Sequence, residues 1–230
     1  MIEFDPVSQI IYEDNHLLVI NKNPTQIVQG DKTGDRPLNE SIKRFLKEKY
    51  NKPGNVFLGV VHRIDRPASG LVLFAKTSKA LTRVNEMIKR GDLRKTYWII
   101  VAKRPEQEEG ELENHLWKYE KKNKSFVVDS KKKGAKKALL HYRYLRSKNN
   151  LHLIEVELKT GRHHQIRVQF AHLGNPVKGD VKYGFPKAND GPFIHLHAQR
   201  LELTHPVTGE ILKLEADPPE EKSWSVFIKE

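Results

Sequence analysis

The apolar residues of this chain recur in short runs that alternate between strand-like and helix-like spacing. Two runs near the amino-terminal end, residues 10–12 and 17–21, flank a polar turn and predict a β-hairpin. Pro37 is suited to be the first residue of a helix. The apolar stripe that this helix would bury is formed by Leu38, Ile42, Phe45 and Leu46. The amino-terminal part is therefore expected to combine a hairpin with a helix.

A second helical pattern and a series of strand-like runs follow. The helical face stops at Gly91, a residue typical of helix C-termini, and consists of Ala80, Leu81, Val84, Met87 and Ile88. The remaining apolar runs predict strands at residues 56–61, 71–74, 97–101, 139–145, 151–158, 194–203 and 224–228. Residues 166–173 fit both a strand and a helix that ends before Gly174, so periodicity leaves this segment open.

No long linker divides the chain into domains. The only candidate boundaries are the polar stretches at residues 30–35 and 187–191, and both are short enough to be loops. A chain of 230 residues is long enough to bury a sizeable core. We therefore expect a single domain over residues 1–230.

The segment His62–Gly70 sets one carboxylate, Asp65, between Arg63 and Arg66. An aspartate held between permanent positive charges stays ionised, which suits a nucleophile or an electrostatic anchor better than a general acid. The arginines could also bind phosphates of a nucleic-acid backbone. The alternative is an ordinary structural ion pair or cap.

A second basic cluster, Gly161–Arg167, lies about a hundred residues downstream and contains two more arginines and two histidines. A cleft built from both segments would hold one acid among several bases. Such a site is typical of chemistry on a polyanion.

Both clusters belong to a series of motifs that resembles the RluA-like pseudouridine synthases. The matching segments run in family order from about residue 10 to residue 210 and include Ile11–Asp14, Leu17–Lys22, His62–Arg66, Ser69–Gly70, Lys95–Tyr97, Gly161–Arg167, Ala171–Gly174, Gly179–Asp180, Tyr183–Gly184, Leu196–Ala198 and His205–Pro206. Two positions depart from the pattern. Asn23 intervenes between Lys22 and Pro24, and His163 stands where the family more often has Thr or Ser.

The resemblance implies an α+β fold of the pseudouridine synthase type: a mixed, largely antiparallel central β-sheet flanked by helices, with a catalytic cleft across the sheet. It implies a helix at residues 166–173. It also implies the form of the family without an N-terminal S4 domain, because the first motif begins near residue 10. The reaction implied is isomerisation of uridine to pseudouridine in structured RNA, either ribosomal or transfer RNA, without a cofactor or a metal.

The resemblance also assigns catalytic roles. Asp65 matches the family aspartate that acts at the ribose C1′ or assists deprotonation there. Arg167 matches the arginine expected to pair with that carboxylate, and Tyr97 matches the residue expected to stack on uracil and to serve as a late base.

Four further residues are expected to bind the substrate. Arg63 would fill the space left by the extruded uridine, and Ile166 would line the uracil pocket. Arg66 and His62, which flank the aspartate, complete the predicted set. Without the resemblance, Ile166 and Tyr97 would be interpreted as ordinary core residues.

Composition fits an RNA-modifying enzyme of the cytoplasm. Lys and Arg number 41 against 29 Asp and Glu, a net charge of +12, and the isoelectric point is near 9.7. This surplus favours polyanionic partners. Cysteine is absent, which excludes disulfides and thiolate chemistry. No apolar run is long enough to span a membrane, and residues 1–9 do not form a signal sequence.

Most of the surplus charge falls in one stretch, Lys118–Lys148, where twelve Lys or Arg face two acidic residues and give ten net positive charges. The simplest interpretation is a solvated hairpin. Interleaved aromatic residues favour a nucleic-acid face instead, because bases stack on aromatic rings: Trp117, Tyr119, Phe126, Tyr142 and Tyr144.

Two other functions remain open at this point. A metal-dependent RNA phosphodiesterase or nuclease could use some of the eleven histidines, above all His195 and His197, which would share one strand face. A non-catalytic RNA-binding protein is the third possibility. The sequence does not identify the RNA or the uridine, and it leaves the oligomeric state open, with a monomer as the expectation.

Overall fold

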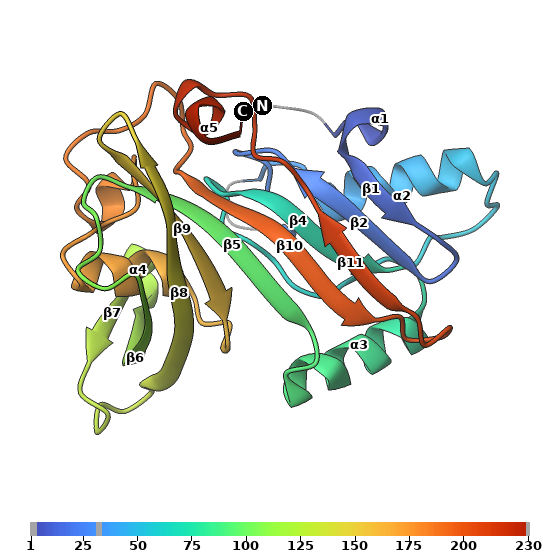
Figure 1. Cartoon of the computed structure of the whole chain (residues 1–230). Helices are drawn as coiled ribbons and strands as arrows, with labels where there is room; N and C mark the ends of the chain where they lie inside the picture. Colours follow the sequence, from blue (N-terminus) through green and yellow to red (C-terminus); the bar gives the residue numbers. More distant parts are fainter. Residues whose placement is uncertain (1–3, 31–33, 229–230) are drawn as a thin grey trace. The chain divides into compact units, whose positions relative to one another are not determined.

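The computed structural model describes residues 4–30 and 34–228 (Figure 1). The chain forms two compact units. One comprises Met1–Arg94 and Ala198–Pro218, and the other comprises Lys95–His197 and Pro219–Glu230. The chain therefore passes between the units within strands β5 (Arg94–Val101) and β10 (Leu196–Thr204) and again between Pro218 and Pro219, not in the loops expected at residues 30–35 and 187–191. Of the first of these loops, residues 31–33 lie outside the described residues. That both units act as one catalytic domain stays a prediction.

The first unit consists of a β-sheet with helices beside it (Figure 1). Its elements are α1 (Pro6–Gln9), β1 (Ile10–Glu13), β2 (Leu17–Lys22), α2 (Leu38–Lys49), β3 (Gly59–Val60), β4 (Ser69–Ala75), α3 (Ser78–Arg90), most of β10 and β11 (Ile211–Glu215). The strands follow the order β1-β2-β4-β10, β11 extends the edge at β10, and β3 pairs with β4.

The core of the first unit lies between α2 and the strands β2 and β4. All seven residues of β4 are buried, so both faces of this strand are covered. A strand with one solvated face would alternate buried and exposed residues instead. The apolar stripe predicted for α2 supplies Leu38, Ile42 and Leu46 to this core. Burial on both faces fixes β4 and, with it, the position of the loop that enters β4 from Asp65.

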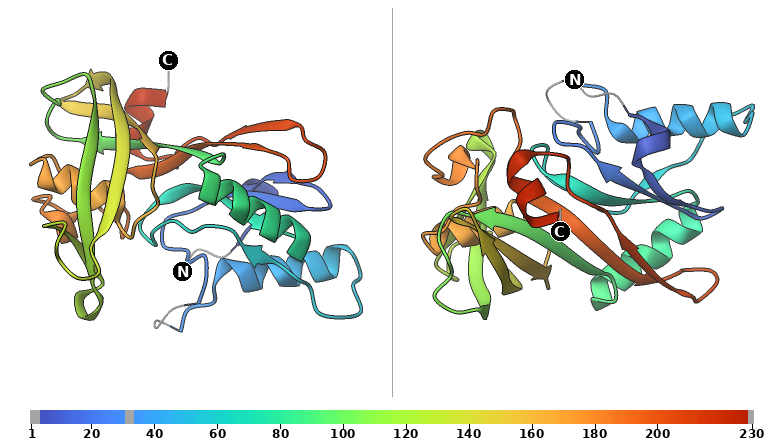
Figure 2. Two further views of the ribbon diagram at one scale, coloured as in Figure 1. Left: turned by 90° about the horizontal axis from the view of Figure 1, so that it is seen from below. Right: turned by 45° about the horizontal axis from the view of Figure 1, so that its top comes forward.

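The second unit contains a five-stranded antiparallel arrangement with two helices packed on it (Figure 2). Its elements are β5, β6 (Glu109–Tyr119), the 3-10 helix η1 (Glu120–Lys122), β7 (Lys124–Val128), β8 (Lys136–Lys148), β9 (Leu151–Leu158), α4 (Gln165–His172), η2 (Val181–Tyr183) and α5 (Lys222–Ile228). The strand order is β5-β9-β8-β6-β7. Helix α4 packs with Val168 on Leu116 and Ala138, and α5 packs with Trp224 and Phe227 on Ile100 and Leu153.

Most elements predicted from periodicity are confirmed. The amino-terminal hairpin forms, and α2 begins one residue after Pro37, which is its N-cap. Helix α3 ends at Arg90, and Gly91 follows with φ 82°, a left-handed conformation that favours glycine. Residues 165–172 form helix α4, as the resemblance implied. Of the strand expected at residues 56–61, only the two residues of β3 form a strand.

The strand predicted at residues 224–228 is wrong, because this segment is helix α5. The carboxylate of Glu221 accepts hydrogen bonds from the backbone N–H groups of Ser223 (2.9 Å) and Trp224 (3.4 Å), which satisfies the first turn of a helix. Trp224 and Phe227, three residues apart, then face the same core. The alternating apolar residues resembled a strand only because the segment is short.

The α+β class is confirmed. Neither periodicity nor length predicted β6, whose first half alternates Glu109, Glu111 and Glu113 with residues that are only partly buried.

Across the part of the chain that the structure describes, no helix is long and apolar enough to cross a membrane.

Candidate active-site residues

Asp65 lies in a loop that backbone hydrogen bonds fix at Asp65 and at the next residue. Its carbonyl oxygen accepts from the N–H of Ala68 (3.0 Å), and the next carbonyl, that of Arg66, accepts from the N–H of Thr25 (2.8 Å). Gly70 then lies in β4 with φ 112°, where a Cβ would lie 2.4 Å from the backbone of Ala198 in the same unit. The loop is therefore anchored by backbone geometry, independently of the Asp65 side chain.

A buried lysine lies next to this loop. Lys22 is fully buried at the end of β2, and its ammonium group donates to three carbonyl oxygens, those of Asn23 (2.9 Å), Gln26 (3.0 Å) and Arg66 (3.3 Å). Burial lowers the pKa of Lys22 to about 7, although the negative charge of Asp65 raises it in part. Lys22 thus ties β2 to the aspartate loop and places a titratable cation in the electrostatic field of Asp65.

In the sequence, Lys22 is visible only as the last residue of a family motif, which assigns it no role. The available signal was a charged residue that ends the apolar run of residues 17–20. A lysine at that position is buried only if it finds acceptors. These acceptors are backbone carbonyls, which no sequence pattern displays.

The residues that flank Asp65 have different surroundings. Arg63 is exposed. The Nη2 atom of Arg66 lies 2.6 Å from a carboxylate oxygen of Asp35. The Nε2 atom of His62 accepts a hydrogen bond from the N–H of Leu73 in β4 (3.2 Å). Arg66 therefore forms a structural ion pair of the kind that was the alternative interpretation of this motif, and His62 supports the loop. Their contacts with RNA stay predictions, as does that of Arg63.

Tyr97 and Ile166, expected to contact uracil, are both buried in the second unit. Tyr97 is 6% exposed in β5, opposite Val156 of β9, and Ile166 is 4% exposed in α4. Such burial fits a closed base pocket and an ordinary core equally well. The roles of these two residues therefore stay predictions.

Arg167 forms a buried bidentate ion pair with Asp180. Its Nε donates to Oδ2 (2.6 Å) and its Nη2 donates to Oδ1 (2.9 Å), and the two side chains are 5% and 1% exposed. The ring of Tyr183 lies 5.1 Å from the guanidinium carbon. One edge of the guanidinium is thereby fixed in direction. The expected partner, Asp65, belongs to the other unit, and this pairing stays a prediction.

Asp180, the partner of Arg167, is a second residue to which the sequence alone assigns no role. In the sequence, Gly179–Asp180 stands out only as one of the motifs that carry the family resemblance. An aspartate next to a glycine is typical of turns, so the pattern itself favours a loop. Only the fold shows that this carboxylate orients Arg167.

The turn before α4 is fixed by one amide side chain. The Oε1 atom of Gln165 accepts from the hydroxyl of Thr160 (2.8 Å) and from the N–H of Arg162 (3.0 Å), while its Nε2 donates to the carbonyl of Leu139 (3.1 Å). His164 just before it adopts φ 54°, a left-handed conformation that is uncommon for a non-glycine residue. This turn sets where α4 begins and hence where Ile166 and Arg167 lie.

The histidines considered as metal ligands have structural contacts. His195 is fully buried, its Nε2 lies 2.8 Å from Glu221, and burial lowers its pKa. The rings of His195 and His197 lie 5.4 and 6.1 Å from that of Trp224. Within residues 4–30 and 34–228, no three His, Asp or Glu residues are grouped so that they could hold a metal ion. These histidines anchor helix α5, which does not favour the nuclease alternative.

The family model described as RNA pseudouridylate synthase matches residues 16–172. This span is more than half of the chain and contains Asp65, Tyr97 and Arg167. The chain belongs to this family. The resemblance inferred from the motifs is thus confirmed. The chain is an enzyme that isomerises uridine to pseudouridine in RNA.

Curated relatives agree over almost the whole chain. "Uncharacterized RNA pseudouridine synthase slr1629" of Synechocystis is 32% identical over 227 residues, which cover 95% of this chain and 69% of the relative. "Ribosomal large subunit pseudouridine synthase C" of Rickettsia typhi is 36% identical over 213 residues, with coverages of 91% and 68%.

A solved structure supports the fold. "Human RNA Pseudouridylate Synthase Domain Containing 4" superimposes with a TM-score of 0.79 at 22% identity and covers 96% of this chain and 92% of that chain. At this identity the likeness shows the pseudouridine synthase fold.

Proposed function

We propose that the chain isomerises a specific uridine by an aspartate-dependent mechanism without a cofactor, and that Asp65 is the reacting group. The observation that carries the proposal is the aspartate loop of the first unit. This loop is anchored by backbone hydrogen bonds at Ala68 and Thr25, and the buried cation Lys22 is coupled electrostatically to its carboxylate. A carboxylate on a fixed loop is preorganised for attack on one carbon atom.

The charge next to Asp65 favours its ionised form. A protonated Lys22 stabilises the carboxylate electrostatically, and a carboxylate is the form that can attack C1′ or remove a proton. The same field makes Asp65 a poor general acid. The proposed reaction therefore begins from ionised Asp65, breaks the bond between C1′ and N1 of uracil, and ends with a bond between C1′ and C5. N1 gains a proton and C5 loses one, so the product is an isomer of the substrate.

Arg167 and Tyr97 complete the proposed machinery. Asp180 fixes one edge of the Arg167 guanidinium, so Arg167 is suited to present its other edge to the reacting carboxylate. Tyr97 would stack on the uracil and accept the proton that leaves C5 late in the cycle. Arg167 and Tyr97 belong to the second unit and Asp65 to the first. That the three residues act together is therefore part of the proposal, and the kcat of variants at each position tests it.

The target uridine must leave its stack before it reaches Asp65. Extruding a base costs a few kcal/mol, and a side chain that occupies the vacated space offsets part of this cost. Arg63 is exposed on the aspartate loop and carries a long, charged side chain suited to this role. Replacing Arg63 should therefore weaken activity on duplex targets more than on single-stranded ones.

We further propose that one face of the β6–β7 hairpin contacts the RNA. Trp117 and Tyr119 lie on the same face of β6, with ring centres 5.6 Å apart, and their partners across the ladder are Phe126 and Lys124. The ammonium group of Lys132 lies 4.7 Å from the ring centre of Trp117. Aromatic rings bordered by lysines are suited to stacked bases and their phosphates.

The opposite face of this hairpin belongs to the core. Leu116 and Val127 pack there with α4. The expectation that Tyr142 lies on the nucleic-acid face is wrong. Tyr142 is 5% exposed and packs edge-on against Phe170, with ring centres 5.7 Å apart. The aromatic residues of the basic stretch therefore divide between core and surface according to the strand register.

The proposed substrate is ribosomal RNA of the large subunit, modified in the cytoplasm. Support comes from relatives named for that substrate, such as "Ribosomal large subunit pseudouridine synthase D" of Zymomonas mobilis, 31% identical over 224 residues. The test is a pseudouridine map of cellular RNA with and without the gene. A site in large-subunit RNA that is lost only in the deletion supports the proposal, and a lost site in transfer RNA contradicts the substrate.

Purified protein should restore that site in a transcript in buffer that contains EDTA. Because the proposed chemistry uses side chains alone, chelation should leave the rate unchanged once RNA folding is controlled for. Activity that returns only with an added divalent metal would favour the histidine-dependent alternative.

A further inference from the structure

Lys95 occupies an unusual position in the second unit. It lies two residues before Tyr97 in β5, and side chains at this spacing point to the same face of a strand. Its ammonium nitrogen lies 3.7 Å from the point where a Cβ on Gly161 would be. The cation is therefore adjacent to the turn that opens the Gly161–Arg167 segment, on the strand face that carries Tyr97.

This ammonium group lacks a partner among the residues that the structure describes. No hydrogen bond, ion pair or ring contact involves the Lys95 side chain within that part of the chain, and burial alone lowers its pKa. Lys22 offers the contrast, because its ammonium group donates to three carbonyl oxygens. The buried guanidinium of Arg167, in the same unit as Lys95, is likewise compensated, by Asp180.

Lys95 is partly buried, so its charge is partly removed from solvent, and no group of the described residues compensates it. A partly desolvated and uncompensated charge destabilises a fold. Residues that break a local rule in this way are expected at functional sites, where a ligand supplies what the protein withholds. The ligand for a primary ammonium is an anion, and the protein as a whole carries a net charge of +12, which favours polyanions.

We propose that Lys95 binds a phosphodiester group of the RNA, next to the nucleotide whose base contacts Tyr97. The inference rests on the proposed function, because it assumes that Tyr97 meets the target uridine. Lys95 would then fix the backbone of the extruded nucleotide while Tyr97 holds its base. A neutral uracil carbonyl is the weaker candidate, since it gives the ammonium group a hydrogen bond but no compensating charge.

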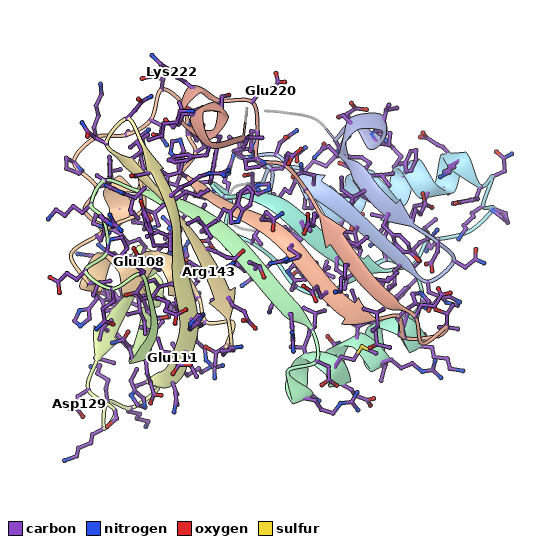
Figure 3. The ribbon with its side chains drawn as sticks, viewed as in Figure 1. Glu108, Glu111, Asp129, Arg143, Glu220 and Lys222 are labelled. Atoms are coloured by element: carbon purple, nitrogen blue, oxygen red, sulfur yellow. The ribbon has the colours of Figure 1, made fainter. Side chains whose placement is uncertain are left out.

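The test combines a protein variant with chemically altered RNA. Lys95→Met removes the charge and keeps the length of the side chain, and Lys222→Met is the matched control at an exposed lysine of the same unit (Figure 3). The probe is a short synthetic RNA that contains the uridine identified by the pseudouridine map. Each phosphate around that uridine is replaced, one at a time, by an uncharged methylphosphonate. Kd is measured by fluorescence anisotropy in an Asp65→Asn background, so that the RNA stays unreacted.

We expect Lys95→Met to weaken binding about tenfold or more. The slope of the logarithm of the binding constant against the logarithm of the salt concentration should become shallower by ~0.7, as the loss of one phosphate contact predicts. One methylphosphonate position should weaken binding of the protein that retains Lys95 by a similar factor and leave Lys95→Met unaffected. Lys222→Met should respond to every RNA as its parent does. Lys95→Arg should recover most of the affinity, since it restores the charge.

The inference is overturned if every methylphosphonate affects the Lys95→Met variant and its parent equally, or if Lys95→Met leaves Kd unchanged. Lys95→Gln is a second neutral variant, and near-ultraviolet circular dichroism shows that each variant is folded. Failure of the proposed function looks different, because then the protein with Asp65 intact forms no pseudouridine in the same RNA. A wild-type protein that is active but shows no coupling between Lys95 and a phosphate contradicts this inference alone.

Discussion

The ion pair between Arg167 and Asp180 predicts a large and specific loss of stability when its carboxylate is neutralised. Asp180→Asn keeps the shape of the side chain but replaces one acceptor oxygen with an NH₂ group that faces the Arg167 guanidinium. One of the two hydrogen bonds, of 2.6 and 2.9 Å, is then lost, and the guanidinium stays buried beside a neutral group.

The magnitude follows from burial. The side chains are 5% and 1% exposed, so solvent compensates the uncovered charge very little. Hydrogen bonds to charged groups contribute about 1.5–3 kcal/mol each, and removal of one partner of a buried pair costs about 3–5 kcal/mol. We expect Asp180→Asn to lower the free energy of unfolding of the second unit by roughly 3 kcal/mol, and Asp180→Ala by somewhat more.

Urea unfolding followed by tryptophan fluorescence measures this effect in the right place, because all three tryptophans, Trp98, Trp117 and Trp224, belong to the second unit. The control is Glu108→Gln, which neutralises the carboxylate of an exposed pair with Arg104 at 2.6 Å (Figure 3). That change should cost less than about 1 kcal/mol.

Activity provides a second readout for the same variant. If Asp180 orients Arg167 for catalysis, folded Asp180→Asn should show a reduced kcat with little change in RNA affinity. A stability loss no larger than that of Glu108→Gln would refute the energetic reasoning. Unchanged kcat in the folded variant would refute the positioning role.

Two further predictions concern the lysines. Replacing Lys131, Lys132 and Lys133 with Gln should weaken RNA binding similarly across sequences and flatten its salt dependence by ~0.7 to 0.9 log units per lost phosphate contact, and an unaltered slope in binding titrations would indicate a solvated hairpin. Lys22 should titrate with a pKa of about 7 in carbon-13 NMR of labelled lysine, because burial disfavours its charged form, and Asp65→Asn should lower this pKa further, because it removes the negative charge that raises it. A Lys22 signal that titrates near the ordinary lysine value of 10.5, or one that Asp65→Asn does not move, would contradict the electrostatic link.

Elements with a clear period could be predicted from the sequence. Helix α3 shows a full apolar face and a terminal Gly91, and local propensity and tertiary packing agree there. Helix α5 could not be predicted, since its N-terminal turn depends on Glu221 and its burial on the partners of Trp224. Short segments contain too few residues for a period to be distinguished.

The residues of the candidate site divide in the same way into those that the sequence reveals and those that only the fold reveals. Asp65 stands out because its charged neighbours are adjacent in sequence, so the motif itself displays the chemistry. Lys22 and Asp180 do not stand out. The partners of Lys22 are backbone carbonyls, one of them that of Arg66, 44 residues away, and the partner of Asp180 is the guanidinium of Arg167, 13 residues away. Contacts that the fold creates between distant residues leave no local pattern in the sequence.

The most direct test of the central claim is the rate of pseudouridine formation by Asp65→Asn. The change keeps the size of the side chain but removes its charge and its nucleophilicity, while the loop stays anchored by backbone hydrogen bonds. Loss of a nucleophile typically lowers the rate by many orders of magnitude. Single-turnover measurements on saturating RNA should therefore detect no product from a folded variant that binds RNA as tightly as the wild type. A folded Asp65→Asn protein that isomerises uridine at a rate near wild type would contradict the account.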